Sequence, residues 1–498
     1  MARIPLLSGA QVVLAQAPDD ATVLRPPAPP EHGIDVSAAV RDALRFPLDG
    51  QPLETLARGA RRATIVVEPT VLPIPSVDAD PRQLAIAAVV DELERNGIAS
   101  GYQTILVAGG LARRMGGRDI ESLVTPELAR RFHGRVVVHD AEDPELVVVV
   151  DGSVPLRVNP ALTDTDLVIA VTAAETVLHG GPAALLAAAD AETLRAAGAY
   201  SLLETAASQG WQLATRLERA LAERTPVLGV SVVLNHPVVS GLLHGYPYDP
   251  AALARIARSP LRFGFSALPG FGRRFVLRSL PAEVSVAAVF AGPPSTAHAE
   301  ALLRAVELRR ATLDAPLDVL VIGIPSTTPF LPRERPNPLL AAYLGLGLAL
   351  RLWRDAFPIV DGGSAILLHP FHRRFQHPTQ QPYRAFFHAT RFGRDPLELA
   401  DAERAAADDP RAIEAYRAGR TVHPLLPFRD WNGCQPALGR LGAVFVAGAR
   451  DATAARELGF VPVQNIPAAL ELARGRAGGE ARVGFLLAPP YFPLRVGT

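Results

Sequence analysis

Two histidines in the first half of the chain stand where an imidazole could transfer a proton. His139 is followed directly by Asp140, and a neighbouring carboxylate can orient an imidazole for acid–base work. His179 precedes the pair Gly180-Gly181, a flexible backbone that could approach a ligand. We take His139 and His179 as candidate catalytic residues. The alternative for His139 is a structural role in a turn or cap.

A second group of histidines lies in an arginine-rich stretch of the second half. The residues of this group are His369, His372, Arg373, Arg374, His377, Arg384 and His388. Histidines combined with carboxylates suit zinc, nickel or iron, but Pro370 prevents a helical His-x-x-His face and the arginines add positive charge. We therefore assign no metal ligand. The set could instead bind a carboxylate or phosphate, or form a solvated loop or subunit contact.

A glycine- and arginine-rich string follows a predicted strand. Residues 106–119 read LVAGGLARRMGGRD, and Gly109, Gly110, Arg113 and Arg114 are its candidate ligand-binding residues. The string resembles the phosphate-binding loop of molybdenum-cofactor guanylyltransferases and related nucleotidyltransferases, in which glycines admit a nucleotide's phosphates. Those enzymes place the loop after their first strand and follow it with a lysine, where this chain has Ile120. We favour a ligand-binding turn at the edge of a sheet, with nucleotidyl transfer at Gly109–Met115 as an alternative.

The chain contains no lysine, so all 50 of its basic residues are arginines. Schiff-base chemistry, lysine general bases and covalent lysine–cofactor adducts need an amine that this chain lacks. High arginine, alanine and proline usage is typical of a GC-rich coding bias. That origin does not restore the missing amine.

Length and composition limit the class of protein. The 498 residues suit two to three domains, and 50 acidic against 50 basic residues argue against a nucleic-acid binder driven by bulk charge. The single cysteine, Cys434, excludes an intramolecular disulfide and fits a reducing compartment. The longest apolar stretch, Leu339–Leu350, is too short to cross a bilayer. We expect a cytoplasmic protein, possible homo-oligomerisation, and neither nucleic-acid nor membrane partners.

The elements that would position these residues alternate between strands and helices. Strands are predicted at 64–67, 104–108, 136–138, 146–150, 167–171, 318–322, 365–368, 442–446, 460–463 and 483–487. Helices are predicted after Asp80-Pro81, at 120–132 and at 338–353, and the long segment 369–427 is either functional or an inserted helical excursion. This alternation predicts an α/β fold with two α/β domains, mostly parallel sheets and an interdomain cleft. The division is placed at residues 1–265 and 266–498, with the last segment expected to pack back on the first domain.

Several short strings occur along the chain, and their order and spacing are informative when they are taken together. They are 43–53 (ALRFPLDGQPL), 56–59 (LARG), 73–75 (PIP), 138–145 (VHDAEDPE), 170–181, 232–235 (VVLN), 289–292 (VFAG) and 457–460 (ELGF). In order and spacing they resemble the nickel-dependent lactate racemase family over roughly residues 35–490. The resemblance implies two α/β domains with the site between them. It also implies 2-hydroxy-acid racemisation by a nickel pincer nucleotide attached to a lysine, with histidines as metal ligand and proton acceptors.

The chemically important positions of that family are replaced here. A catalytic histidine falls on Ala112, the cofactor lysine on Ala183, and the nickel-ligand histidine near Ala199. The substrate-side lysine falls near Tyr343, and the Asp-x-Thr-Arg-Pro cofactor loop reads PTVLP at 69–73. The loop before Gly180 is shorter than in the family, which removes another histidine unless His179 substitutes for it.

Our interpretation is a lactate-racemase-like scaffold without nickel-pincer chemistry and with no cofactor. We expect a small anion, a 2-hydroxy acid or a phosphate or nucleotide, to bind in the interdomain cleft through Gly109, Gly110, Arg113, Arg114, Gly180 and Gly181. We expect Arg373 or Arg374 to face this site across the cleft. An active racemase or epimerase with a noncovalently held cofactor is the alternative from the enzyme class.

Overall fold

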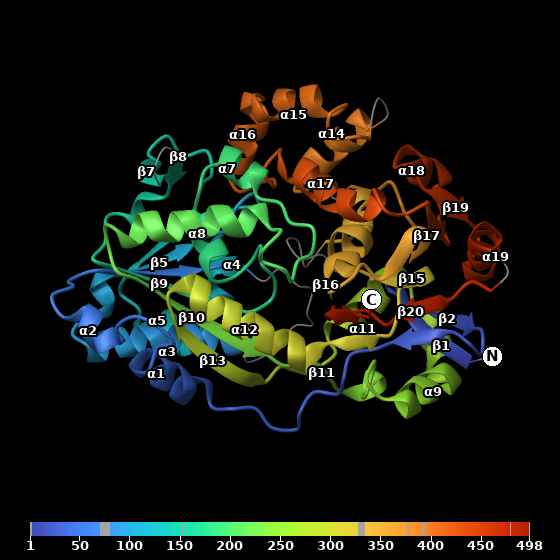
Figure 1. The fold of residues 1–498 in the computed structure, drawn as a ribbon, viewed down its shortest axis with the longest axis horizontal. Coiled ribbons are helices and arrows are strands. Elements are labelled where there is room, and N and C mark those ends of the chain that lie inside the picture. The colour runs from blue at the N-terminus through green and yellow to red at the C-terminus, as the bar shows by residue number, and fades with distance from the viewer. Residues whose placement is uncertain are drawn as a thin grey trace.

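The chain forms two α/β units, each built around its own sheet (Figure 1). The computed structural model describes residues 2–69, 80–151, 154–326, 334–375, 378–390, 394–478 and 480–497. The two sheets lie side by side, and the buried strands of each are sandwiched between helices.

The first unit contains a six-stranded sheet. Its order is β13 (Val286–Gly292), β10 (Val227–Leu234), β9 (Leu167–Ala173), β4 (Ala63–Val67), β5 (Gln103–Val107) and β6 (Arg135–Val138). All neighbouring pairs are parallel except β10 and β13. One face packs on α1 (Val36–Arg45), α2 (Leu53–Ala57) and α3 (Pro81–Arg95), and the other on α6 (Pro182–Leu186) and α8 (Gln209–Ala222). α12 (Pro294–Arg309) packs against β10 and β13.

The second unit contains an eight-stranded sheet. Its main path runs β19 (Val461–Val463), β18 (Ala443–Ala447), β17 (Ile359–Leu368), β15 (Leu317–Pro325), β1 (Ala2–Gly9) and β2 (Gln11–Ala17). β20 (Val483–Leu486) pairs with both β15 and β3 (Thr22–Leu24). α9 (Pro250–Arg258) and α19 (Ile466–Ala477) cover one face. The other face carries α13 (Pro338–Ala342), the π-helical η4 (Tyr343–Leu348), the short helix η5 (Ala349–Arg351) and α17 (Leu426–Leu438).

The predicted α/β class with mostly parallel sheets is confirmed, while the course of the chain differs from the expected division after residue 265. β13 and α12 follow that point but belong to the first unit. The first 24 residues form β1, β2 and β3 in the second sheet, so the amino terminus rather than the last segment crosses between the units. An apolar strand near the amino terminus has the same sequence pattern whether it joins the nearest sheet or a distant one, because strand pairing is a long-range property.

Two local predictions differ from the observed elements, while the segment 369–427 agrees with the helical alternative stated for it. The helix expected at 120–132 is two short helices, α4 (Gly117–Glu121) and α5 (Pro126–Arg131), because Pro126 begins a new helix after the cap residue Thr125. The strand expected at 146–150 is β7 (Val147–Asp151), which pairs only with β8 (Val154–Val158) in a separate hairpin. The long segment 369–427 contains the helices α14 (Gln381–Ala389), α15 (Ala400–Ala407) and α16 (Pro410–Arg417).

The remaining elements are short or peripheral. They are α7 (Ala191–Ala196), α10 (Leu261–Ala267), α11 (Gly270–Arg278), α18 (Ala452–Glu457), η1 (Ser100–Tyr102), η2 (Pro160–Leu162), η3 (Gly241–Leu243), β11 (Val238–Val239), β12 (Ala282–Glu283), β14 (Ala311–Leu313), β16 (Trp353–Arg354) and β21 (Leu494–Val496). Within the described part of the chain, no helix combines the length and apolarity needed to span a bilayer.

Candidate functional site

A pocket lies at the carboxyl edge of the first sheet, where α17 of the second unit meets it. Its empty volume, including the open mouth, is about 590 Å³. The loops after the neighbouring strands β4, β5 and β9 supply Glu68, Gly109, Gly110 and His179, and α17 supplies Arg429. The crevice outside the carboxyl ends of parallel strands is where α/β proteins usually bind ligands. The predicted position of the site at this edge therefore coincides with a pocket between the units.

An imidazole and a carboxylate form one wall of the pocket. Nδ1 of His179 lies 3.9 Å from Oε1 of Glu68, and both side chains are largely buried. Oε2 of Glu68 accepts a hydrogen bond from the Gly180 backbone N–H at 2.6 Å. This backbone bond fixes the carboxylate beside the imidazole, so the pair could hold or move a proton at the pocket wall.

The two glycines after His179 are required by the conformation of the loop. Gly180 has a φ of +91° and Gly181 a φ of +52°, both in the left-handed region that favours glycine. A Cβ on either would lie 2.3 Å from a ring or Cβ atom of His298. The N–H of Gly181 is bonded to the Thr172 hydroxyl at 2.9 Å. Gly180 and Gly181 therefore shape the loop behind the pocket, and their amides already have partners within the protein.

His298 supports this loop from α12 and was not singled out by the sequence. It is completely buried, and Nε2 lies 3.0 Å from the Thr176 carbonyl while Nδ1 lies 3.1 Å from the Ser231 hydroxyl. Burial is the main cause of its lowered pKa. The sequence around His298 did not indicate a role for it. Its neighbours in the helix are mostly small residues, and its partners Thr176 and Ser231 are far away along the chain.

Arg429 is the cation that the second unit places at the pocket. It lies three residues after Leu426 on α17, so both side chains reach the same face of the helix and line the pocket. Among the described residues, its guanidinium has neither a salt bridge nor a side-chain hydrogen bond, although it interacts electrostatically with the adjacent buried Asp430, and Nη1 is 3.9 Å from where a Cβ on Gly110 would be. An arginine without an ion pair at the pocket favours an anion there.

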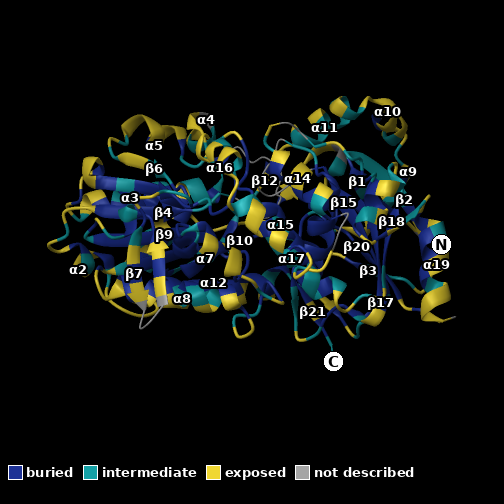
Figure 2. Cartoon of the chain, turned by 90° about the horizontal axis from the view of Figure 1, so that it is seen from above, coloured by how far each residue is buried: buried dark blue, intermediate teal, exposed yellow. Residues whose placement is uncertain are grey.

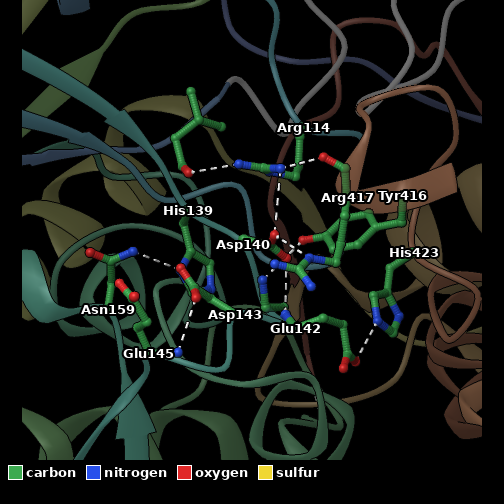
Figure 3. A network of polar contacts seen from close by, with 12 residues as sticks. Arg114, His139, Asp140, Glu142, Asp143, Glu145, Asn159, Tyr416, Arg417 and His423 are labelled. Carbon is green, nitrogen blue, oxygen red and sulfur yellow. Dashed lines mark hydrogen bonds and ion pairs between the residues drawn. The ribbon is translucent and has the colours of Figure 1, made fainter. Parts of the chain in front are cut away.

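Arg113 and Arg114 lie on the predicted loop but do not line the pocket. Nη2 of Arg113 pairs with Asp119 at 2.6 Å, and Nη1 of Arg114 lies 3.4 Å from Asp140. Arg114 also donates to the backbone carbonyl of Arg417 in the second unit (Figure 3). These arginines fasten the loop and the units together, and the Gly110 N–H is likewise engaged, with the Ala187 carbonyl at 3.0 Å.

His139 lies outside the pocket lining, and both of its ring nitrogens have partners, one of which, Asn159, is labelled in Figure 3. Nε2 lies 2.8 Å from the Ala189 carbonyl, and Nδ1 lies 3.4 Å from the Asn159 amide nitrogen. Burial lowers the pKa of His139 to about 4, so the ring is neutral near pH 7. This geometry favours the structural alternative that the sequence left open for His139.

A network of polar contacts joins the loops after β5 and β6 to α16 and the following segment (Figure 3). Asp140 pairs with the Nε of Arg417 at 3.1 Å, and Glu142 lies 2.9 Å from Nε2 of the buried His423. The segment 369–427 thus packs on the first unit beside the pocket, so it helps to position the pocket wall.

The histidine–arginine group of the second unit is dispersed. His369 is buried and Nδ1 accepts the Phe371 N–H at 3.1 Å, and burial lowers its pKa to about 3. Arg373 pairs with Glu457 at 3.1 Å and Asp451 at 3.6 Å. Neither Arg373 nor Arg374 lines the pocket, where the second unit contributes Arg429 instead. The remaining histidines are the half-buried His372, the exposed His388 and His377, which lies outside the described residues.

Comparison with known proteins supports the family suggested by the sequence. Residues 9–181 match the family model of the lactate racemase N-terminal domain. The resemblance to the lactate racemase family is thereby confirmed for this part of the chain. The lactate racemase apoprotein from Thermoanaerobacterium thermosaccharolyticum shares the fold, with a TM-score of 0.62 and 16% identity over 99% of this chain and 100% of that chain. A protein of known structure from Thermotoga maritima gives a TM-score of 0.50 and 13% identity, covering 92% of this chain and 98% of its own. No curated protein sequence matches the chain.

Three of the positions at which the lactate racemase resemblance places functional residues line the pocket, namely Ala112, Ala183 and Pro69. Ala112 and Ala183 are both almost completely buried in its wall. The Ala199 carbonyl accepts a hydrogen bond from the buried Arg351, and Tyr343 is buried on η4. Pro69 lines the pocket, while residues 70–75 of the cofactor loop and the PIP string lie outside the described residues.

Among the described residues, the pocket lacks the lysine and the histidine that the resemblance places at positions 183 and 112 for the nickel pincer cofactor. The pocket wall is mainly alanine and leucine, and His179 is its one described histidine. Among the described residues, no three histidine, cysteine or acidic side chains gather where they could hold a metal ion. With Ala183 in the lysine position and no lysine in the chain, covalent attachment through an amine has no acceptor.

Proposed function

We propose that this chain is a lactate-racemase-like protein that binds a small carboxylic acid in the pocket without nickel-pincer chemistry. The observation that supports this proposal is the guanidinium of Arg429, which forms no salt bridge with any described residue and borders a largely apolar pocket wall. Such an arginine attracts a carboxylate and can bind both of its oxygens. The apolar wall around Ala112 and Ala183 suits a short hydrocarbon portion of the ligand.

The backbone favours a carboxylate over a phosphate or nucleotide. Phosphate-binding loops present several free N–H groups to their ligand. In the two glycine-containing loops at the pocket, the amides of Gly110, Gly180 and Gly181 are bonded to other protein groups. A 2-hydroxy acid needs fewer donors, and its hydroxyl could reach His179 on the opposite wall.

The test is calorimetric titration of the purified chain with L-lactate, D-lactate and inorganic phosphate. We expect lactate to bind, and Arg429→Gln to weaken binding about tenfold or more, the lower end of what a buried charged hydrogen bond contributes. Arg404→Gln is the matched control, because Arg404 is 70% exposed and pairs only with Asp401 on its own helix. Equal affinities for the wild type and Arg429→Gln would contradict the proposed site.

A racemase or epimerase is the second candidate, favoured by the His179–Glu68 pair. An imidazole 3.9 Å from a carboxylate could accept a proton from a bound 2-hydroxy acid. Polarimetry of L-lactate incubated with the chain separates the candidates. We expect no loss of optical activity. Racemisation that disappears in His179→Gln would establish the enzyme and overturn the binding-only proposal.

A further inference from the structure

Two short helices on the second unit carry large apolar side chains that face solvent. On α10, Leu261 is 63% and Phe263 is 68% exposed, and on α11, Phe271 is 71% and Phe275 is 72% exposed. No residue of α11 is buried, and α10 buries only Phe265. Figure 2 shows both helices at the periphery of the molecule with exposed residues along them. A cluster of this kind on a folded protein marks a contact surface.

The same segment is strongly basic. Residues 250–282 contain six arginines and no acidic residue. On α11, Arg274 and Arg278 are four residues apart, as are Phe271 and Phe275, so cations and phenyl rings occupy adjoining faces of one helix. Partial burial and the neighbouring Arg335, Arg278 and Arg273 lower the pKa of Arg274. Positive charge is therefore concentrated beside the exposed rings.

The two helices are tied to each other at the end of α10. The guanidinium of Arg273 on α11 donates to the Ser266 carbonyl at 2.9 Å and to the Leu268 carbonyl at 3.0 Å. These bonds hold α11 against the end of α10. Beyond the hairpin, α9 anchors the segment by packing on β1.

We propose that the α10–α11 hairpin docks on the surface of an anionic lipid bilayer. Phe263, Phe271 and Phe275 would enter the boundary between headgroups and acyl chains, while the arginines pair with lipid phosphates. Helices of seven and nine residues lie on a bilayer rather than cross it. A symmetric contact between two copies is disfavoured, because a two-fold axis would place these arginines against each other. The aliphatic Leu261 favours lipid over a single-stranded nucleic acid, which needs a groove and stacking rings.

Vesicle co-sedimentation of the full chain tests the proposal. We expect binding to vesicles of phosphatidylcholine mixed with phosphatidylglycerol, little binding to phosphatidylcholine alone, and weaker binding at high salt. The double variant Phe271→Ser/Phe275→Ser should lose about tenfold or more in partitioning, and Arg274→Gln/Arg278→Gln should lose the preference for anionic lipid. Phe46→Ser is the matched control, since Phe46 is 80% exposed on the first unit. Unchanged melting temperatures verify that the variants fold.

Several results would overturn the proposal. The wild type could fail to bind anionic vesicles, or the phenylalanine variants could bind as well as the wild type. Light scattering could show a dimer that dissociates on Phe271→Ser/Phe275→Ser, which would assign the hairpin to self-association. Preferential binding of an oligonucleotide, lost in the same variant, would assign it to nucleic acid.

Discussion

The phenol of Tyr416 donates a hydrogen bond to the Gly110 carbonyl at 3.2 Å, and it accepts one from the Ala141 N–H at the same distance. One buried hydroxyl on α16 thus ties together the loops after β5 and β6, which belong to the other unit. Because Gly110 lines the pocket, the position of the pocket wall depends on this contact between the units.

Tyr416→Phe should destabilise the chain by about 1–3 kcal/mol, because it leaves the Gly110 carbonyl and the Ala141 N–H buried without a partner. Urea unfolding followed by tryptophan fluorescence measures the change. Tyr102→Phe is the control, since Tyr102 is 66% exposed. Identical unfolding midpoints for the two variants would show that the Tyr416 hydroxyl does not stabilise the contact.

His139 should make stability depend on pH. Its pKa is about 4 in the folded chain, where burial disfavours the charged ring, against about 6.5 when unfolded. Between these values the unfolded chain binds more protons, so the free energy of unfolding falls as the pH falls from about 6.5 to about 4. The shift corresponds to about 3 kcal/mol. His139→Gln should be less stable than the wild type at pH 7, but the difference should shrink by about this amount near pH 4. Parallel pH profiles in urea unfolding would contradict the assignment.

Substitution by alanine should affect stability differently at two glycines of the site. Gly180→Ala places a Cβ 2.3 Å from the His298 ring and 2.6 Å from the Ala173 carbonyl at a φ of +91°, which should cost about 2 kcal/mol or more. Gly109→Ala meets no atom within 4 Å and should leave the melting temperature unchanged while narrowing the pocket. Thermal unfolding combined with lactate titration distinguishes the two effects. A Gly180→Ala variant as stable as Gly109→Ala would show that the loop can move.

The chain should acquire neither a covalent cofactor nor nickel. When it is co-expressed with the enzymes that build the pincer nucleotide, its intact mass should equal that of the unmodified chain, since Ala183 stands in the lysine position. Metal analysis should find far less than one nickel ion per chain. A nucleotide-sized mass increase, or stoichiometric nickel lost on His179→Gln, would restore the racemase interpretation.

Whereas β10, β13 and β1–β3 were not predicted, the sequence was sufficient for many strands of the two sheets, because their apolar, β-branched runs are long and local. Leu167–Ala173 and Ala63–Val67 are examples, each buried along its entire length. The hairpin strand β7 has the same appearance, with four consecutive valines, but sits outside the sheet. Local pattern does not specify which strands pair, so the positions of β1–β3 and β7 could not be predicted.

The sequence predicted which loops form the candidate site, but it did not predict all of the side chains that line it. Gly109, Gly110 and His179 lie at the pocket because strand ends converge at one sheet edge, a consequence of topology. The sequence did not indicate Glu68 or Arg429, because only folding brings these two residues to the same pocket from distant parts of the chain. The pairing of Arg113 with Asp119 had a signal, since the carboxylate is six residues further along the same string. The net charge of zero did not indicate the basic α10–α11 hairpin, because it is a sum over the whole chain.

The pairing of the amino-terminal strands has a consequence for the order of events during synthesis. Ser8 on β1 pairs with Ile324, and Thr22 on β3 pairs with Gly484. β1 can pair with the adjacent β2 early, but it cannot join β15, and β3 cannot join β20, until those distant strands have been synthesised. The edge of β1 that faces β15 and the edge of β3 that faces β20 therefore stay open after β4, β5 and β9 are able to assemble, and an open strand edge can pair wrongly in that interval.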